Sequence, residues 1–169
     1  MSGYGSDLHE TPNIDRLADE GIKFTNAYSA AAICSPTRAS IMTGKYPARL
    51  NMTTWHENSG APEPNTHNKL LAPTTIGDLP LDEVTIAEKL KEEGYFTAHI
   101  GKWHLGDAHH YPETQGFDIN IGGTMWGMPQ TYWYPFRGWR STDQELRYVP
   151  GLEDMGNYDK KTYLTDRLT

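Results

Sequence analysis

Two segments of the chain share one order of elements: a capped helix, then a glycine, then an apolar strand. In the first, 11–28, Thr11 suits the N-cap, and a proline follows at the first helical position, where its missing N–H costs nothing. Apolar residues stand at helical spacing at positions 14, 17 and 18, and Gly21 is placed to end the helix in a left-handed turn. The alternating residues 22–28 predict a strand.

The second segment, 85–100, repeats this order. Thr85 precedes a helical pattern over 86–93, Gly94 follows it, and 95–100 is predicted to be a strand. Helices and strands that alternate in this way are typical of parallel sheets covered by helices. The sequence therefore predicts an α/β fold with a mostly parallel sheet flanked by helices.

Length and charge exclude several classes of protein. A chain of 169 residues suits one domain, 1–169, and a net charge of −7 argues against a broad electrostatic surface for nucleic acid. No apolar run is long enough for a membrane span, and the residues after Met1 lack the basic start and apolar core of a signal peptide. These observations leave the localisation open.

The stretch 107–158 differs in composition from the rest of the chain. Aromatic residues are interleaved there with glycines and prolines, which predicts an irregular, aromatic-rich loop or lid within the single domain. Packing in the core and lid is the favoured role for these side chains, and stacking on a sugar ring is the alternative. The pattern of residues 159–169 predicts the start of a helix.

The only cysteine, Cys34, stands at the start of a predicted short helix. Ser35 suits the N-cap, Pro36 the first helical position, and Gly44 the residue that ends the helix. Cys34 is thus expected at the positive end of the helix, with Arg38 about one turn further along. The thiol, the helix N-terminus and the arginine together predict an anion-binding site. The alternative is a small buried thiol beside a solvated arginine.

A second group of candidate residues follows the predicted strand 95–100. Lys102 and His104 are two residues apart, so in an extended chain both side chains point to the same face. They stand where a strand runs into a loop, which is where ligands bind in parallel α/β sheets. Lysine can hold an anion as a point charge, and histidine can exchange a proton with it. The alternative is an exposed lysine and a loop histidine with structural hydrogen bonds.

Both groups resemble signature motifs of the type I sulfatases. The Cys-x-Pro-x-Arg pattern of 34–38, with Thr-Gly following, resembles the motif whose cysteine is oxidised to formylglycine, and Gly-Lys-Trp-His-Leu-Gly at 101–106 resembles the second motif. The segments 11–18 and 116–118 also resemble family sequences. The resemblance covers nearly the whole chain. It implies an alkaline-phosphatase-like sulfatase sandwich, of which this chain would be an N-terminal fragment, incomplete at both ends.

The resemblance implies a role for each candidate residue in the hydrolysis of sulfate esters. Cys34, once converted to formylglycine by a maturation enzyme, would be both the nucleophile and a metal ligand. Arg38 would stabilise it, while Lys102 and His104 would bind the sulfate and assist the leaving group. An aldehyde hydrate suits this chemistry because one hydroxyl attacks sulfur and the second later expels the bound sulfate. The implied substrate is a small sulfate ester or a sulfated glycan.

The resemblance also implies a calcium ion, held by carboxylates and an amide that face the formylglycine. The segments that carry these other ligands in the family are expected to lie outside this chain. Carboxylates that could substitute for them are expected to be solvated surface groups. They are Asp7, Glu10, Asp78, Asp82 and Asp107. The adjacent His109 and His110 are a weak metal signal, because neighbouring residues on a strand point apart.

Two alternative functions stay open from the sequence. A phosphate or phosphonate monoester hydrolase of the same superfamily would carry the same Cys-x-Pro-x-Arg pattern, although the motif at 101–106 favours sulfate. The other alternative is a truncated fragment without catalysis. A missing first strand would expose a sheet edge, and this predicts self-association.

Overall fold

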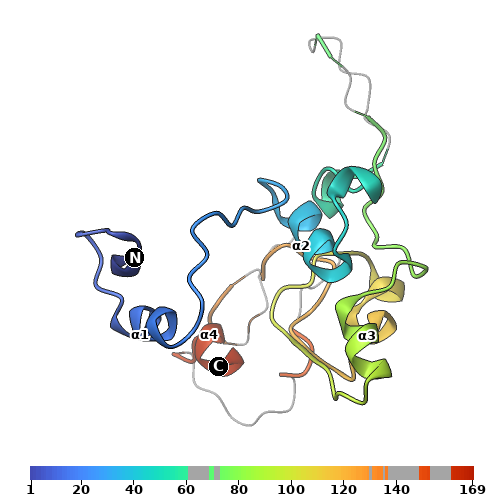
Figure 1. Ribbon diagram of the computed structural model, residues 1–169. Coiled ribbons are helices and arrows are strands. Elements are labelled where there is room, and N and C mark those ends of the chain that lie inside the picture. The colour runs from blue at the N-terminus through green and yellow to red at the C-terminus, as the bar shows by residue number, and fades with distance from the viewer. Residues whose placement is uncertain (61–68, 71–72, 130, 135, 137–148, 153–160) are drawn as a thin grey trace.

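The structure is a computed structural model that describes all residues except 61–68, 71–72, 130, 135, 137–148 and 153–160 (Figure 1). Its helices are α1 (Pro12–Glu20), α2 (Cys34–Thr43), α3 (Ile86–Glu92) and α4 (Leu164–Leu168), and its strands are β1 (Ala98–Ile100) and β2 (Ile119–Ile121). Short 3-10 helices occupy Ser2–Tyr4, Pro47–Arg49, His56–Asn58, Ala108–His110 and Pro112–Gln115. No helix in the described part of the chain is long and apolar enough to span a membrane.

The sheet consists of β1 and β2, which pair in parallel with Ala98 opposite Ile119 and Ile100 opposite Ile121. A parallel sheet with helices confirms the predicted α/β class. The prediction of an irregular stretch is wrong where β2 lies, inside 107–158. A strand of three residues alternates too briefly to be recognised from its sequence alone.

Side-chain hydrogen bonds at the start of the strands hold β1 against β2. The backbone N–H of Thr97 donates to Oδ2 of Asp118 at 2.9 Å, and the Thr97 hydroxyl donates to the carbonyl of Gly116 at 2.7 Å. The hydrogen bond from Lys91 and those from Thr97 lower the pKa of Asp118 to about 2. The predicted strand 95–100 is shortened to its last three residues, because β2 offers partners only from Ile119 onward.

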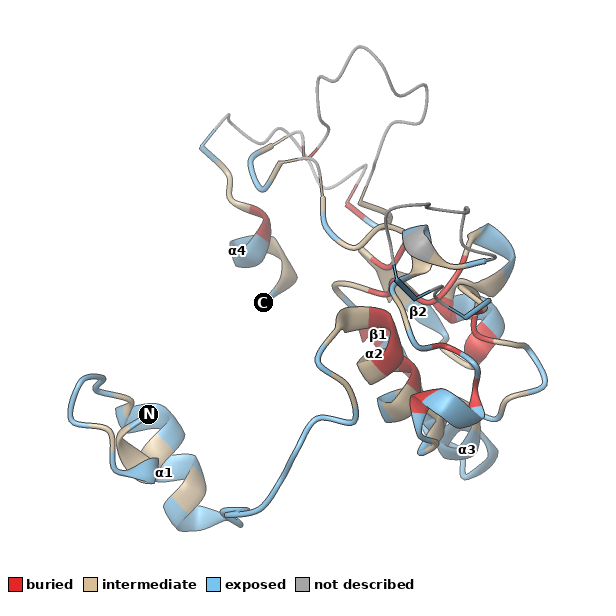
Figure 2. Ribbon diagram, turned by 90° about the horizontal axis from the view of Figure 1, so that it is seen from above, coloured by how far each residue is buried: buried red, intermediate tan, exposed pale blue. Residues whose placement is uncertain are grey.

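The N-terminal segment with α1 lies apart from the other labelled helices and strands in Figure 2. Helix α1 confirms the predicted helix, although none of its residues is buried. The predicted strand 22–28 is wrong: no strand is present there, and Ile22, Phe24 and Tyr28 are exposed. A strand needs a neighbour for its backbone groups, and no described residue pairs with this segment.

The ends of α1 also differ from the prediction. The Thr11 hydroxyl makes no hydrogen bond to the backbone of the helix and instead donates to Oδ1 of Asp15 at 3.0 Å. The carboxylate of Asp15 also accepts from the backbone N–H of Gly3 at 2.7 Å, so it ties the N-terminal residues to the helix. Gly21 has a φ of −122°, which is not left-handed.

The C-terminal end of α2 and both ends of α3 follow the predicted chemistry more closely. Gly44 ends α2 with a φ of +69°, and Gly94 follows α3 with a φ of +84°. At the start of α3 the Thr85 hydroxyl accepts from the N–H of Glu88 at 3.2 Å, and Oε2 of Glu88 accepts from the N–H of Thr85 at 2.7 Å. This reciprocal pair is a capping box, which satisfies two donors that the helix itself leaves unpaired.

The main core packs α2 against the segments around β1, where buried residues gather in Figure 2. Its buried members are Ala39, Leu50, Met52, Leu79, Trp103 and Leu105. The ring of His99 meets that of Trp103 edge-on at 5.2 Å, and Phe117 meets Trp103 at 6.0 Å. The motif at 101–106 is therefore anchored in the core through Trp103 and Leu105.

A second, smaller core lies near α4. Phe136, Leu152 and Leu164 are buried together there. Helix α4 confirms that residues 159–169 open a helix, for those of them that the structure describes.

Candidate functional site

Helix α2 begins at Cys34, which is half-buried, and Ile33 is its N-cap residue. The predicted start, capped by Ser35, is wrong because the Ser35 hydroxyl is used elsewhere. It donates to the carbonyl of His104 at 2.9 Å and accepts from the backbone N–H of His56 at 3.1 Å. One buried hydroxyl thus joins the first turn of α2 to two distant segments.

Arg38 reaches from α2 to the turn that follows β1. Its Nε donates to the carbonyl of Trp103 at 2.6 Å, and its Nη2 donates to the carbonyl of Lys102. Burial lowers the pKa of Arg38, and the Coulombic interaction with Cys34 opposes that shift. A guanidinium stays charged in proteins, so these hydrogen bonds hold a permanent positive charge at a fixed place.

Cys34, Arg38 and Lys102 line one cavity of about 530 Å³. The other described residues of its lining are uncharged, namely Ser29, Ala31, Ala32, Ile33, Thr37 and Ile41. Two cationic side chains and no carboxylate among these residues suit an anion. The structure therefore brings together three of the four site residues that the sequence predicts.

The fourth predicted residue, His104, is buried and does not belong to this lining. The expectation that Lys102 and His104 share a strand face is wrong, because β1 ends at Ile100 and His104 has a φ of +61°. The ring Nε2 of His104 lies 2.5 Å from Oε2 of Glu57. Burial lowers the pKa of His104, and the hydrogen bond with Glu57 opposes this shift.

Glu57 is the site residue that sequence reasoning missed. It lies in the 3-10 helix His56–Asn58, and its Oε1 is 3.4 Å from the backbone nitrogen of Gly127. A single glutamate in an irregular segment, 47 positions from its partner His104, leaves no local pattern to find. Only the folded chain shows the contact.

Lys102 also lines a second cavity, of about 150 Å³. Its other walls are largely aromatic and apolar, and include Trp126, Met128, Tyr132 and Leu164. The two cavities thus share Lys102, with charged groups in the larger and apolar side chains in the smaller.

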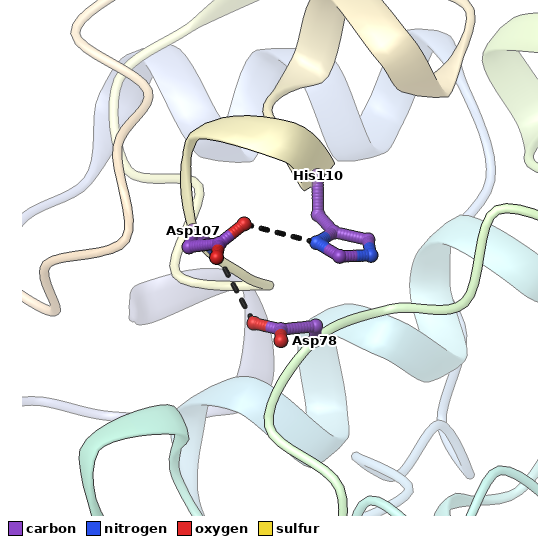
Figure 3. A group of neighbouring side chains, drawn as sticks. All are labelled: Asp78, Asp107 and His110. Carbon is purple, nitrogen blue, oxygen red and sulfur yellow. Dashed lines mark hydrogen bonds and ion pairs between the residues drawn. The ribbon is translucent and has the colours of Figure 1, made fainter.

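Asp78, Asp107 and His110 form a group that could hold a metal ion, with ligand atoms that all lie within 4.8 Å of one another (Figure 3). The backbone N–H of Asp107 donates to Oδ1 of Asp78 at 3.1 Å. Oδ1 of Asp107 is 3.1 Å from Nδ1 of His110 and accepts from the backbone N–H of His109 at 3.0 Å. These bonds close the turn around Ala108–His110, which accounts for the group without an ion.

The expectation of solvated carboxylates holds in part. Asp7, Glu10 and Asp82 are exposed, as predicted. The side chains of Asp78 and Asp107 are 40% and 48% exposed, so they too lie at the surface, but both also accept hydrogen bonds. Neither lines the cavity beside the cysteine.

Comparison with known proteins gives consistent matches. The family model described as Sulfatase matches residues 1–168. Steryl-sulfatase from Homo sapiens is 42% identical over 126 residues, which are 70% of this chain and 20% of that protein. Arylsulfatase G from Mus musculus is 42% identical over 120 residues, 69% of this chain and 20% of that protein. The chain therefore spans about a fifth of the length of these relatives.

Solved structures share the fold. The crystal structure of Ps i-CgsB matches with a TM-score of 0.67 and 33% identity, over 98% of this chain and 35% of that chain. The structure of BT4656 in complex with D-glucosamine-2-N,6-O-disulfate matches with a TM-score of 0.51 and 37% identity, over 72% of this chain and 19% of that chain. These similarities confirm the alkaline-phosphatase-like α/β fold predicted from the sequence.

Proposed function

The chain belongs to the sulfatase family, and from this premise we propose that the protein hydrolyses sulfate esters, with Cys34 in its formylglycine form as the nucleophile. The cavity that Cys34 shares with Arg38 and Lys102 carries the proposal. Its two positive charges, with no carboxylate in the described lining, match the negative charge of a sulfate group.

Each residue has a distinct role in this proposal. Formylglycine supplies, as its hydrate, one hydroxyl that attacks sulfur and a second that releases sulfate as the aldehyde re-forms. Arg38 keeps its charge because a guanidinium is not deprotonated in proteins, and two backbone carbonyls fix its position. Lys102 binds sulfate oxygens as a point charge. His104 exchanges protons with the reacting groups.

Family membership also implies a metal ion. Calcium prefers carboxylate and carbonyl oxygens, and the cavity beside Cys34 has no carboxylate in its described lining. The group of Asp78, Asp107 and His110 mixes imidazole with carboxylates, a donor set that suits a transition metal better than calcium. The described residues thus do not fit the calcium site that the resemblance implies, and the roles given above do not depend on one.

We propose a small sulfate ester or a sulfated glycan as the substrate. Because Lys102 lines both cavities, the sulfate group fits the larger one while the organic part extends toward Trp126 and Tyr132 in the smaller. The structure of BT4656 was solved with a sulfated sugar, which supports this substrate class. A phosphate or phosphonate ester is not favoured, because the relatives carry the names of sulfatases.

Paired hydrolysis assays test the proposal. Protein produced together with a formylglycine-generating enzyme is first analysed by mass spectrometry, which also tests the proposed maturation of Cys34. Converted protein and the Cys34→Ala variant are then given an aryl sulfate and the matching aryl phosphate. Turnover of the sulfate above the phosphate, absent in Cys34→Ala, is the expected result. A folded, converted protein without turnover would contradict the proposal for this chain and favour the alternative of a fragment without catalysis.

A further inference from the structure

Glu57 and His104 form a bonded pair that the chemistry proposed above does not explain. Oε2 of Glu57 lies 2.5 Å from Nε2 of His104, and the exposed fraction of the side chain is 3% for His104 and 32% for Glu57. We propose that Glu57 is a positioning residue, which keeps the proton of His104 on Nε2 and leaves Nδ1 free to accept another. The proposal rests on the function proposed above, in which His104 exchanges protons.

The charge states of Glu57 and His104 determine which of the two contacting atoms carries the hydrogen. Burial raises the pKa of Glu57, but its hydrogen bonds, chiefly that with His104, bring the pKa below the usual value. Burial lowers the pKa of His104, which favours the neutral imidazole. An ionised carboxylate can only accept, and a neutral imidazole has one N–H. The N–H therefore stands on Nε2, and Nδ1 carries a lone pair.

The Nδ1 atom of His104 is buried and has no hydrogen-bond partner in the described part of the chain. A buried acceptor without a partner is uncommon and unfavourable, and in a native structure it calls for an explanation such as a catalytic role. With the proton fixed on Nε2, Nδ1 is the ring atom that is able to accept a proton.

The backbone of His104 is held in one conformation. Its φ of +61° is left-handed, which is uncommon for a residue other than glycine. Ser35 donates to its carbonyl at 2.9 Å, and its own N–H donates to the carbonyl of Thr124 at 2.9 Å. Its ring packs against Gly127, where a Cβ atom would lie 2.8 Å from the ring Cε1. These contacts fix the backbone of His104 and so place its ring. The hydrogen bond to Glu57 then determines which ring nitrogen carries the proton.

Other titratable groups also act on His104. Lys102 and His56 both lower its pKa, and the ring of His56 lies edge-on with its centroid 6.4 Å away. Glu57 acts in the opposite direction. Removing the charge of Glu57 is therefore expected to lower the pKa of His104 further.

Nitrogen-15 NMR of the histidine rings tests the assignment directly, because it reports which ring nitrogen is protonated and requires no turnover. The His104 signals are identified by their loss in His104→Gln. We expect the proton on Nε2 in the wild-type protein and a mixture of both tautomers in Glu57→Ala. Glu57→Gln should keep Nε2 protonated, since its amide oxygen still accepts, but with a lower pKa for His104. A proton on Nδ1 in the wild-type protein, or unchanged His104 signals in both variants, would overturn the proposal.

Kinetics of the formylglycine-bearing protein give a second readout. Glu57→Ala should lower kcat by about 10- to 100-fold, as expected when the partner that orients a functional imidazole is lost, with KM nearly unchanged. In Glu57→Gln the acidic limb of the plot of kcat against pH should move to lower pH. This second variant keeps the test decisive if Glu57→Ala does not fold. Glu83→Gln, a change in a half-buried glutamate paired with Lys45, is the matched control and should behave as wild type.

The two proposals fail in different ways. A wild-type protein that shows no turnover but has Nε2 of His104 protonated contradicts the proposed function and leaves the role of Glu57 in setting the tautomer supported. Turnover that is the same in Glu57→Ala as in the wild-type protein, with the same pH profile, overturns the positioning role alone.

Discussion

The guanidinium of Arg38 is bonded to the backbone of Trp103, with Nε donating to the carbonyl oxygen at 2.6 Å. The indole of Trp103 is fully buried, and its Nε1 donates in turn to the carbonyl of His110 at 2.8 Å. The arginine beside the candidate nucleophile is therefore attached to one of the best-buried side chains of the core. Changes at Arg38 should disturb both the stability of the fold and the charge in the cavity.

Arg38→Lys should reduce stability and activity together. A single ammonium group cannot reproduce the two hydrogen bonds that the guanidinium makes to the carbonyls of Lys102 and Trp103. Hydrogen bonds to charged groups contribute about 1.5–3 kcal/mol, so we expect a loss of about 2 kcal/mol in the free energy of unfolding measured in urea. Arg16→Lys, in an exposed pair with Glu20, is the control. Equal stability of both variants would contradict the structural role of Arg38.

Lys102→Gln should weaken anion binding with little effect on folding. The Lys102 side chain lines both cavities, and only its backbone carbonyl bonds to Arg38. We expect KM for an aryl sulfate, and the inhibition constant of free sulfate, to rise by about tenfold, which corresponds to about 1.4 kcal/mol of binding free energy. Lys89→Gln, in an exposed pair with Glu92, should change neither constant. Sulfate binding that is the same in Lys102→Gln and wild type would place the anion elsewhere.

Stability should fall as the pH drops from 6.5 to 4. Burial and then the charge of Arg38 lower the pKa of His99 to about 4, from 6.5 in an unfolded chain. Between these values the unfolded state binds the proton and the folded state does not, so the free energy of unfolding decreases with falling pH. At about 1.4 kcal/mol for each pKa unit, the decrease is about 3 kcal/mol.

His99→Phe should remove most of this pH dependence in urea unfolding measured from pH 4 to 8. Phenylalanine retains an aromatic ring against Trp103 and Phe117 and carries no titratable group. His9→Asn, at an exposed histidine, is the control and should keep the wild-type slope. Asp118, with its pKa at about 2, loses its stabilising effect at lower pH than His99. A wild-type slope in His99→Phe would mean that another group is responsible.

Self-association should depend on concentration. Strands β1 and β2 pair only with each other in the described chain, so each keeps one edge without a partner, and Ile100 and Ile119 are exposed. Sedimentation velocity over a wide concentration range should therefore show oligomers, and Ile100→Lys should reduce them. Leu17→Lys makes the same kind of change on the exposed face of α1, away from the sheet, and should leave them unchanged. A monomer at every concentration would refute the prediction.

The parts of the fold that could be predicted from the sequence are those fixed by local chemistry. The N-cap at Thr85, the glycine at 44 and the helix at 12–20 each follow from residues within one or two turns. The strand 22–28 and β2 were not predicted correctly, because a strand depends on a partner that local sequence does not specify. Segment 22–28 alternates in polarity but has no partner strand in the described chain. Strand β2 is only three residues long, yet it pairs with β1.

The residues of the candidate site also divide into those that sequence motifs indicate and those that only the tertiary fold brings together. The two motifs drew attention to Cys34, Arg38 and Lys102, and the structure places these three residues around one cavity, while their roles stay a prediction. Glu57 could not be predicted, since its importance comes from a contact with His104 that only the tertiary fold creates. The geometry of His104 was missed for a related reason: its left-handed backbone replaces the extended conformation assumed for the motif.

The hydrogen bonds of Ser35 and Arg38 to residues 102–104 join positions that lie 64 to 69 residues apart in the chain. Helix α2 can start to form from its own sequence, but its first turn acquires these partners only after the intervening chain has closed a long loop. The first turn of α2, where Cys34 stands, therefore depends on long-range closure of the chain as well as on its own sequence.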